Sequence, residues 1–144
     1  MNRRVLLDTG PLVALLNQRD QYHAWSKNQW AAAVPPFQTC EAVISEACFL
    51  LRSVPNGNRA VMELLRREII EVTFRVAEHL DPVARLMAKY ADLPISLADA
   101  CLVCMAEISP GGPILTLDRH FRLFRKSNRQ VLPAIMPADD MPTR

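Results

Sequence analysis

Hydrophobic residues fall into two kinds of segment that alternate along the chain. Short apolar runs are typical of strands buried in a parallel sheet, and two of them lie at Arg3–Leu7 and Ile114–Leu117. Ile69–Phe74 is rich in β-branched residues and also predicts a strand, and Phe37–Thr39 is a candidate for a brief one. Longer segments repeat apolar residues every three or four positions, which predicts amphipathic helices. These segments lie at Leu12–Asn17, Gln21–Ala33, Thr39–Leu51 (with Thr39 as the N-cap), Arg59–Arg67, Val76–Tyr90 and Leu97–Ile108.

The alternation of strands and helices predicts a parallel sheet that carries helices on both faces. We therefore expect the α/β class, with a three-layer α/β/α sandwich around a mostly parallel central sheet. No internal repeat or linker is visible, so residues 1–132 are predicted to form a single domain. Residues 133–144 contain Pro133, Pro137 and Pro142 and are expected to form a loosely held C-terminal tail.

Composition excludes several classes of protein. Half of the residues are hydrophobic and 22% are charged, which is typical of a globular domain. No apolar run approaches the roughly 20 residues of a membrane-spanning helix, and Asp8 interrupts the apolar start that a signal peptide would need. We expect a cytoplasmic protein. Its four cysteines lie in apolar stretches and are expected to be free thiols, because Cys101 and Cys104 have no second pair of zinc ligands.

Four acidic residues occupy positions where acids are unexpected. Asp8 follows the first predicted strand and Asp118 follows the fourth, and the carboxyl ends of parallel strands are where sites form in open sheets. Glu46 and Asp99 lie on predicted helices, and most residues three or four positions away from them are apolar. Both helical acids are therefore expected to face the core.

Clustered carboxylates require a counter-charge. Two unit charges about 4 Å apart repel by roughly 4 kcal/mol at an effective dielectric constant near 20. A divalent cation relieves that repulsion, and a site made of oxygen ligands suits Mg²⁺ or Mn²⁺. Each acid also has a structural alternative. Asp8 and Asp118 could cap the segments that follow them, and Ser96 with Asp99 fits a capping box, whereas Glu46 has the weakest alternative.

Four motifs, in this order, resemble the PIN-domain family, and in particular its VapC-type toxin ribonuclease branch. They are LLDTGPLVALL with Asp8, TCEAVISEACFLL with Glu46, LPISLADACLVCMAE with Asp99, and ILTLDRHF with Asp118. Each motif alone is loosely defined, but the ordered set spans nearly the whole chain, from Val5 to Phe124.

The resemblance implies a PIN-like fold and a metal-dependent endoribonuclease that hydrolyses RNA phosphodiester bonds. Catalytic Mg²⁺ or Mn²⁺ would be held by Asp8, Glu46, Asp99 and Asp118, and would activate a water and stabilise charge on the leaving oxygen. Thr116 and Thr9 correspond to hydroxyl residues near the acids of the family. Asp92 corresponds to an additional acid of some members, with a loop residue before Pro94 as the alternative. The resemblance further implies the toxin of a type II toxin–antitoxin pair, with a small antitoxin protein as partner, and a homodimer.

Basic residues concentrate directly after Asp118. Arg119, Arg122, Arg125 and Lys126 lie within eight residues, and no acid appears between Arg119 and Ala138. A basic flank would draw an RNA backbone towards an acidic metal site, so these four residues are candidates for RNA binding. The alternative is a solvated charged segment. His120 lies close enough to Asp118 in sequence to be a candidate substrate contact, with a surface histidine as the alternative.

Two other functions need to be weighed. The stretch VLLDTG is similar to the active-site strand of an aspartic protease, but that fold is all-β and rich in glycine, whereas this chain has only four glycines and mostly helical patterning. The stronger alternative is a PIN-like module that binds RNA or protein without catalysis. The presence of all four acids favours the enzyme.

Overall fold

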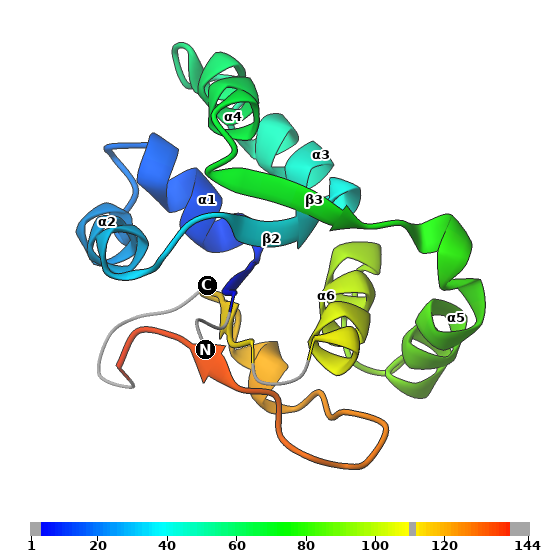
Figure 1. Ribbon diagram of the computed structural model, residues 1–144. Coiled ribbons are helices and arrows are strands. Elements are labelled where there is room, and N and C mark those ends of the chain that lie inside the picture. The colour runs from blue at the N-terminus through cyan, green and yellow to red at the C-terminus, as the bar shows by residue number, and fades with distance from the viewer. Residues whose placement is uncertain (1–3, 110–111, 139–144) are drawn as a thin grey trace.

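Five parallel strands form the central sheet of the computed structural model, which describes residues 4–109 and 112–138 (Figure 1). The strands are β1 (Leu6–Leu7), β2 (Phe37–Cys40), β3 (Ile70–Phe74), β4 (Ile114–Leu115) and β5 (Ala134–Ile135). Their order across the sheet is β3-β2-β1-β4-β5, and every neighbouring pair is parallel. Since β1 lies between β2 and β4, the residues that follow β1 and β4 emerge next to each other.

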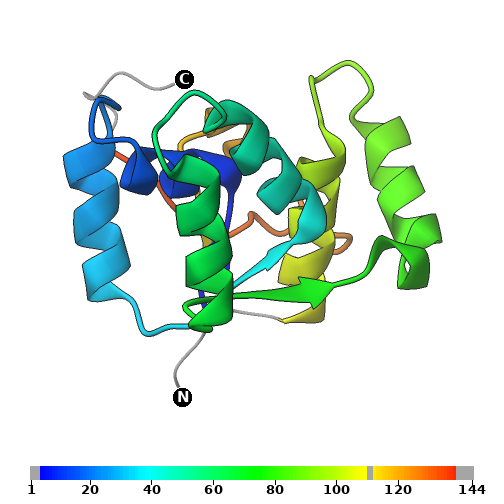
Figure 2. The same ribbon diagram turned by 90° about the horizontal axis from the view of Figure 1, so that it is seen from above.

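Helices cover both faces of this sheet (Figures 1 and 2). They are α1 (Thr9–Leu16), α2 (His23–Ala32), α3 (Glu41–Leu50), α4 (Gly57–Arg66), α5 (Leu80–Lys89) and α6 (Leu97–Ile108), with short 3-10 helices η1 (Val76–Glu78) and η2 (Arg119–Arg122). Alternate strand residues pack into two different cores. Leu6 and Ile114 join α6 in one core, whereas Leu7 and Leu115 join α1, α3 and α4 in the other. The predicted three-layer sandwich with a parallel sheet is confirmed.

Most predicted elements differ from the structure by a few residues at their ends, and two of these differences change the picture. The segment predicted as one helix over Val76–Tyr90 is divided, because η1 ends at Glu78 and α5 begins at Leu80 with Pro82 in its first turn. Thr39 does not cap α3, as the sequence suggested. The N-cap is Cys40, and the Thr39 hydroxyl instead donates a hydrogen bond of 2.7 Å to the carbonyl of Leu7, which ties β2 to β1.

The C-terminal region differs from the expected tail. Ala134–Ile135 forms β5, which pairs with β4 directly after Pro133. The sheet therefore extends beyond residue 132, where the sequence analysis placed the end of the domain. The remainder of the predicted tail, residues 139–144, lies outside the described residues, as does Arg3 at the start of the first predicted strand.

Two further predictions concern the cysteines and membranes. Cys40, Cys48, Cys101 and Cys104 are all free thiols. Within residues 4–109 and 112–138, no helix has the length and apolar character needed to cross a bilayer.

Candidate active site

A cavity of about 350 Å³ opens where β1 and β4 end, and all four candidate acids line it. The acidic residues come from four different elements, and small and apolar residues complete the wall. The lining residues are Asp8, Thr9, Gly10, Glu46, Leu50, Pro94, Ser96, Asp99, Leu117, Asp118 and His120. We call this space the acidic cavity. Its position agrees with the rule that sites in parallel sheets form beyond the carboxyl ends of the strands.

Asp8 is fixed at the floor of the acidic cavity by both its backbone and its side chain. Its N–H donates to the carbonyl of Leu115 at 3.0 Å, which extends the pairing of β1 with β4. As the N-cap of α1, its Oδ1 accepts a hydrogen bond of 2.8 Å from the N–H of Thr9. Its Oδ2 accepts one of 2.6 Å from the hydroxyl of Thr116. The side chain is therefore held in one orientation, and the residue is only 7% exposed.

Thr116 links two of the acids. Its hydroxyl donates to Asp8 and accepts a hydrogen bond of 2.9 Å from the N–H of Asp118. The side chain is completely buried. The sequence analysis placed Thr116 beside the last acid on the basis of the resemblance, and the structure shows that it contacts both acids of the sheet.

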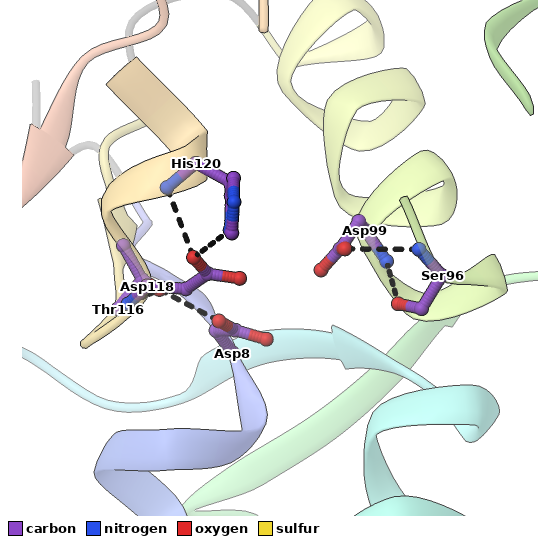
Figure 3. Close-up of polar contacts among 6 residues, drawn as sticks. All are labelled: Asp8, Ser96, Asp99, Thr116, Asp118 and His120. Atoms are coloured by element: carbon purple, nitrogen blue, oxygen red, sulfur yellow. Dashed lines mark hydrogen bonds and ion pairs between the residues drawn. The ribbon is translucent and has the colours of Figure 1, made fainter. Parts of the chain in front are cut away.

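Asp118 is also held by His120. Its Oδ1 accepts hydrogen bonds from the backbone N–H of His120 at 2.9 Å, as the N-cap of η2, and lies 2.7 Å from Nδ1 of the same residue. Figure 3 shows Asp8 and Asp118 side by side, with the carboxylate of Asp99 across the cavity from them. One carboxylate oxygen of Asp118 is thus occupied by His120, which leaves Oδ2 for other partners.

Asp99 enters the cavity from the first turn of α6. The hydroxyl of Ser96 accepts a hydrogen bond of 3.0 Å from the N–H of Asp99, and Oδ2 of Asp99 accepts one of 3.0 Å from the N–H of Ser96. This is the predicted capping box, and it coexists with the position of Asp99 in the cavity. The residue is 7% exposed, as expected for an acid on a buried helix. The structural and functional explanations of this residue therefore do not exclude each other.

Glu46 does reach the cavity, but the reason given from the sequence is wrong. Val43, one turn before it, is buried in the core, but Phe49 and Leu50, one turn after it, are 62% and 44% exposed, so the apolar spacing does not bury this part of α3. Glu46 itself is exposed and contributes to the rim of the acidic cavity. An apolar stripe in a small domain can remain at the surface, because apolar atoms supply more than half of the surface of folded proteins.

The electrostatics of the cavity favour a cation. The pKa of Asp8 is raised to about 7, mainly by burial. The hydrogen bonds from Thr116 and Thr9 oppose this rise in pKa, and the charges of Asp99 and Asp118 add to it. Burial also raises the pKa of Asp99, with the charges of Asp118 and Glu46 acting in the same direction. Among the described residues, no lysine or arginine lines the cavity to compensate these carboxylates.

The donor atoms fit a divalent cation that prefers oxygen. Four carboxylates line the cavity, and the buried hydroxyl oxygen of Thr9 has no hydrogen-bond partner within the described part of the chain. In their present positions, no three histidine, cysteine, aspartate or glutamate side chains of residues 4–109 and 112–138 form a ready metal site. This arrangement suits Mg²⁺ better than a metal that needs a closed protein shell, because Mg²⁺ commonly binds one or two carboxylates and retains several waters.

The remaining predicted site residues lie outside the acidic cavity. Asp92 is exposed in the turn before Pro94 and does not line it. None of the four candidate RNA-binding residues lines it either, although all belong to η2 or the segment directly after it. Those residues are Arg119, Arg122, Arg125 and Lys126.

Sequence reasoning missed Gly10 as a cavity residue. A Cβ atom at Gly10 would lie only 3.1 Å from side-chain atoms of Leu117, so the absence of a side chain lets α1 start close to the segment that carries Asp118. The position of Gly10 two residues after the first acid was the only signal available in the sequence.

Comparison with known proteins identifies relatives over most of the chain. Residues 5–126 match the family model of the PIN domain. Ribonuclease VapC26 of Mycobacterium tuberculosis is 28% identical over 124 residues, which cover 84% of this chain and 92% of that protein. The crystal structure of VapC20 of Mycobacterium tuberculosis, a toxin that cleaves the sarcin–ricin loop, has a TM-score of 0.65 and 22% identity, and the match covers 72% of this chain and 82% of that chain. At 22% identity, the match to VapC20 shows a shared fold.

Proposed function

Because this chain belongs to the PIN-domain family, we propose that it is a metal-dependent endoribonuclease whose active site is the acidic cavity. The resemblance to VapC-type proteins noted from the motifs is confirmed by the two relatives, both of which are VapC proteins. The relative found by sequence is a ribonuclease, and it matches over most of both chains. This supports hydrolysis of RNA phosphodiester bonds as the reaction of this chain.

One observation carries the proposal more than any other. Acids from four separate elements line a single cavity, and among the described residues no lysine or arginine lines it to compensate them. Such an arrangement is unfavourable unless a cation is bound. Helix capping accounts for the local position of Asp8, Asp99 and Asp118, but it does not require their side chains to line the same cavity.

The proposed cofactor is Mg²⁺ or Mn²⁺, held by Asp8, Glu46, Asp99 and Asp118. When bound, the cation supplies Lewis acidity for the hydrolysis of a phosphodiester. The residues of the chain contribute preorganisation. Thr116 fixes Asp8, and the capping box fixes Asp99 before any ligand arrives. Thr9, with its buried and unpartnered hydroxyl, is proposed as a supporting residue of the site.

We further propose that the protein is the toxin of a type II toxin–antitoxin pair, which forms a homodimer and is inhibited by a small antitoxin protein. The VapC relatives support this proposal. The exposed side chains of Phe49 and Leu80, at 62% and 61%, offer apolar surface to protein partners. Arg119, Arg122, Arg125 and Lys126 are proposed to bind the RNA backbone.

The test is cleavage of structured RNA by the purified protein in Mg²⁺, in Mn²⁺ and in EDTA. We expect cleavage that requires the metal and is lost in Asp8→Asn and Asp99→Asn. Asp81→Asn is a matched control, because this aspartate is exposed on α5 and does not line the acidic cavity. Cleavage that survives either cavity variant contradicts the proposed site. If every variant binds RNA and none cleaves it, including the wild type, the protein is the non-catalytic module considered above.

A further inference from the structure

A second cavity, of about 280 Å³, lies between α5, the end of α6 and the segment after η2. Its character is opposite to that of the acidic cavity, since three basic side chains face one carboxylate. The lining residues are Pro82, Arg85, Leu86, Lys89, Glu107, Arg125 and Ser127. We call this space the basic cavity. The function proposed above assigns Arg125 to RNA binding but gives no role to Arg85 and Lys89.

Arg125 is built into the wall of the basic cavity. Its backbone N–H donates a hydrogen bond of 2.9 Å to the hydroxyl of Tyr90, which follows α5. Its guanidinium Nη1 donates to the carbonyl of Phe124 at 3.0 Å, and the residue is half-buried. These hydrogen bonds hold Arg125 opposite α5, so its side chain is less mobile than that of an ordinary surface arginine.

Glu107, the single acid of the basic cavity, has a structural task. Its carboxylate accepts a hydrogen bond from the N–H of Ser127, which attaches the segment after η2 to the end of α6. That contact keeps Arg125 opposite α5. The carboxylate of Glu107 thus helps to position Arg125. Because three basic side chains line the cavity with this one acid, its net charge remains positive.

Arg85 and Lys89 complete the basic cavity from one face of α5, four residues apart and both exposed. In the described part of the chain neither residue forms an ion pair with a carboxylate, although the exposed Arg66 of α4 and its C-cap Arg67 both do so with Glu63. Nζ of Lys89 lies 5.2 Å from the centre of the Tyr90 ring. Within the described residues none of the three basic groups forms an ion pair with Asp81, which lies one turn before Arg85 on α5, so together they form a suitable site for an anion.

Helix α6 and the segment from Asp118 to Ser127 each contribute residues to both cavities. Helix α6 carries Asp99 near its start and Glu107 near its end, so these residues are separated by about 12 Å along the helix axis. The chain from Asp118 to Ser127 also runs from one cavity to the other. In Figures 1 and 2, α5 and α6 lie next to each other, on the same side of the sheet.

We propose that the basic cavity binds a phosphodiester group of the RNA strand whose scissile bond lies in the acidic cavity. The inference rests on the proposed ribonuclease function and assigns to Arg85, Lys89 and Arg125 the task of holding the substrate backbone. Four carboxylates repel a polyanion, and a positively charged site on the same two elements offsets that repulsion. An extended ligand with repeated negative charges is favoured over a single phosphate, since only the former engages both cavities.

The test measures RNA binding separately from cleavage. All variants are made in an Asp99→Asn background, and the probe is a fluorescent oligouridylate of about 12 nucleotides in Mg²⁺. We expect Arg85→Gln/Lys89→Gln to bind the probe on the order of ten-fold more weakly than the parent. The slope of log K against log salt should also decrease by about 1.4, which corresponds to about 0.7 per lost phosphate contact on a single strand.

The matched control is Arg19→Gln/Arg59→Gln, which removes the same charge from two exposed arginines outside both cavities. Equal weakening in the control would overturn the inference, because net charge alone would then explain binding. Unchanged affinity in the α5 double variant would also overturn it. If the otherwise wild-type chain cleaves no RNA and the α5 variant still loses affinity selectively, the proposed nuclease function fails and the basic cavity stands as an RNA-binding site.

Discussion

The start of α6 and the middle of α3 both supply an acid to the same cavity, but in different ways. Asp99 is 7% exposed and is held by a reciprocal pair of hydrogen bonds with Ser96. Glu46 is exposed and accepts no hydrogen bond from the residues that the structure describes. The comparison shows that a helix cap can preorganise a functional carboxylate, whereas the side chain of a mid-helix acid at the cavity rim remains free to change its orientation.

The largest expected effect separates these two acids directly. Asp99→Asn should lower RNA cleavage by about 1,000-fold, equivalent to about 4 kcal/mol, because it removes a fixed charge from the site. Glu46→Gln should lower cleavage by only about ten-fold, because an exposed side chain can be replaced by water near the cation. Rate constants under single-turnover conditions measure both effects. Equal losses in the two variants would remove the distinction between the fixed and the adjustable acid.

Burial of Asp8 should appear in the pH dependence of stability of the metal-free chain. The folded-state pKa of Asp8 is raised from 3.8 to about 7, so the folded protein holds this proton more tightly than the unfolded chain. The resulting stabilisation is complete below pH 3.8 and is lost as the pH rises towards 7, which amounts to roughly 4 kcal/mol. Urea unfolding in EDTA at pH 5 and pH 8 should show Asp8→Asn gaining stability relative to wild type at the higher pH. A difference that does not change with pH would contradict the assigned burial of the charge.

Thr116→Val tests whether the acids of the sheet depend on their shared hydroxyl. The variant removes the donor to Asp8 and the acceptor for the N–H of Asp118. We expect cleavage to decrease by about 10- to 100-fold and the free energy of unfolding by about 1–3 kcal/mol. Thr116→Ser keeps the hydroxyl, so its cleavage rate and its free energy of unfolding should both be close to those of the wild type. If Thr116→Val retains cleavage and stability while Thr116→Ser loses them, packing of the methyl group rather than the hydrogen bonds explains the position.

The smallest expected effect comes from a variant that leaves the carboxylate of Asp99 less firmly held, as that of Glu46 is. Ser96→Ala breaks one half of the capping box, so the free energy of unfolding should decrease by about 1 kcal/mol. Cleavage should decrease several-fold, because the carboxylate of Asp99 loses part of its fixation. Thermal melting and cleavage rates measure the two effects, with Ser96→Thr as the matched control. A stability loss without any change in rate would show that the cap does not position the functional carboxylate.

The fold was largely predictable because the central strands β1 and β4 are short, apolar and buried on both faces, and because helical segments alternate with the strands. The exceptions have physical explanations. Pro133 and Pro137 suggested a loose tail, yet Ala134–Ile135 completes the sheet through pairing with β4, a tertiary contact that the local sequence does not encode. The break before α5 was signalled by Pro82, which favours a first helical turn, but the apolar spacing on both sides hid it.

The site was predictable where an acid follows a strand. Asp8 and Asp118 had to emerge together once β1 and β4 were neighbours. For acids on helices, the sequence gives the spacing of apolar residues but not their burial. The prediction that an acid among apolar residues faces the core was right for Asp99, whose helix is buried. It was wrong for Glu46, whose neighbours Phe49 and Leu50 remain exposed. The basic cavity could not be predicted, since Arg85 and Arg125 become neighbours only through the packing of α5 against α6 and the segment after η2.

Titration with Mn²⁺, followed by calorimetry, tests the central claim most directly, which is that the carboxylates of the acidic cavity bind a divalent cation. The account predicts saturable binding to the wild-type chain, a marked loss of affinity in Asp8→Asn and Asp99→Asn, and unchanged affinity in Asp81→Asn. Binding that is equally strong in the cavity variants and in the control would contradict it.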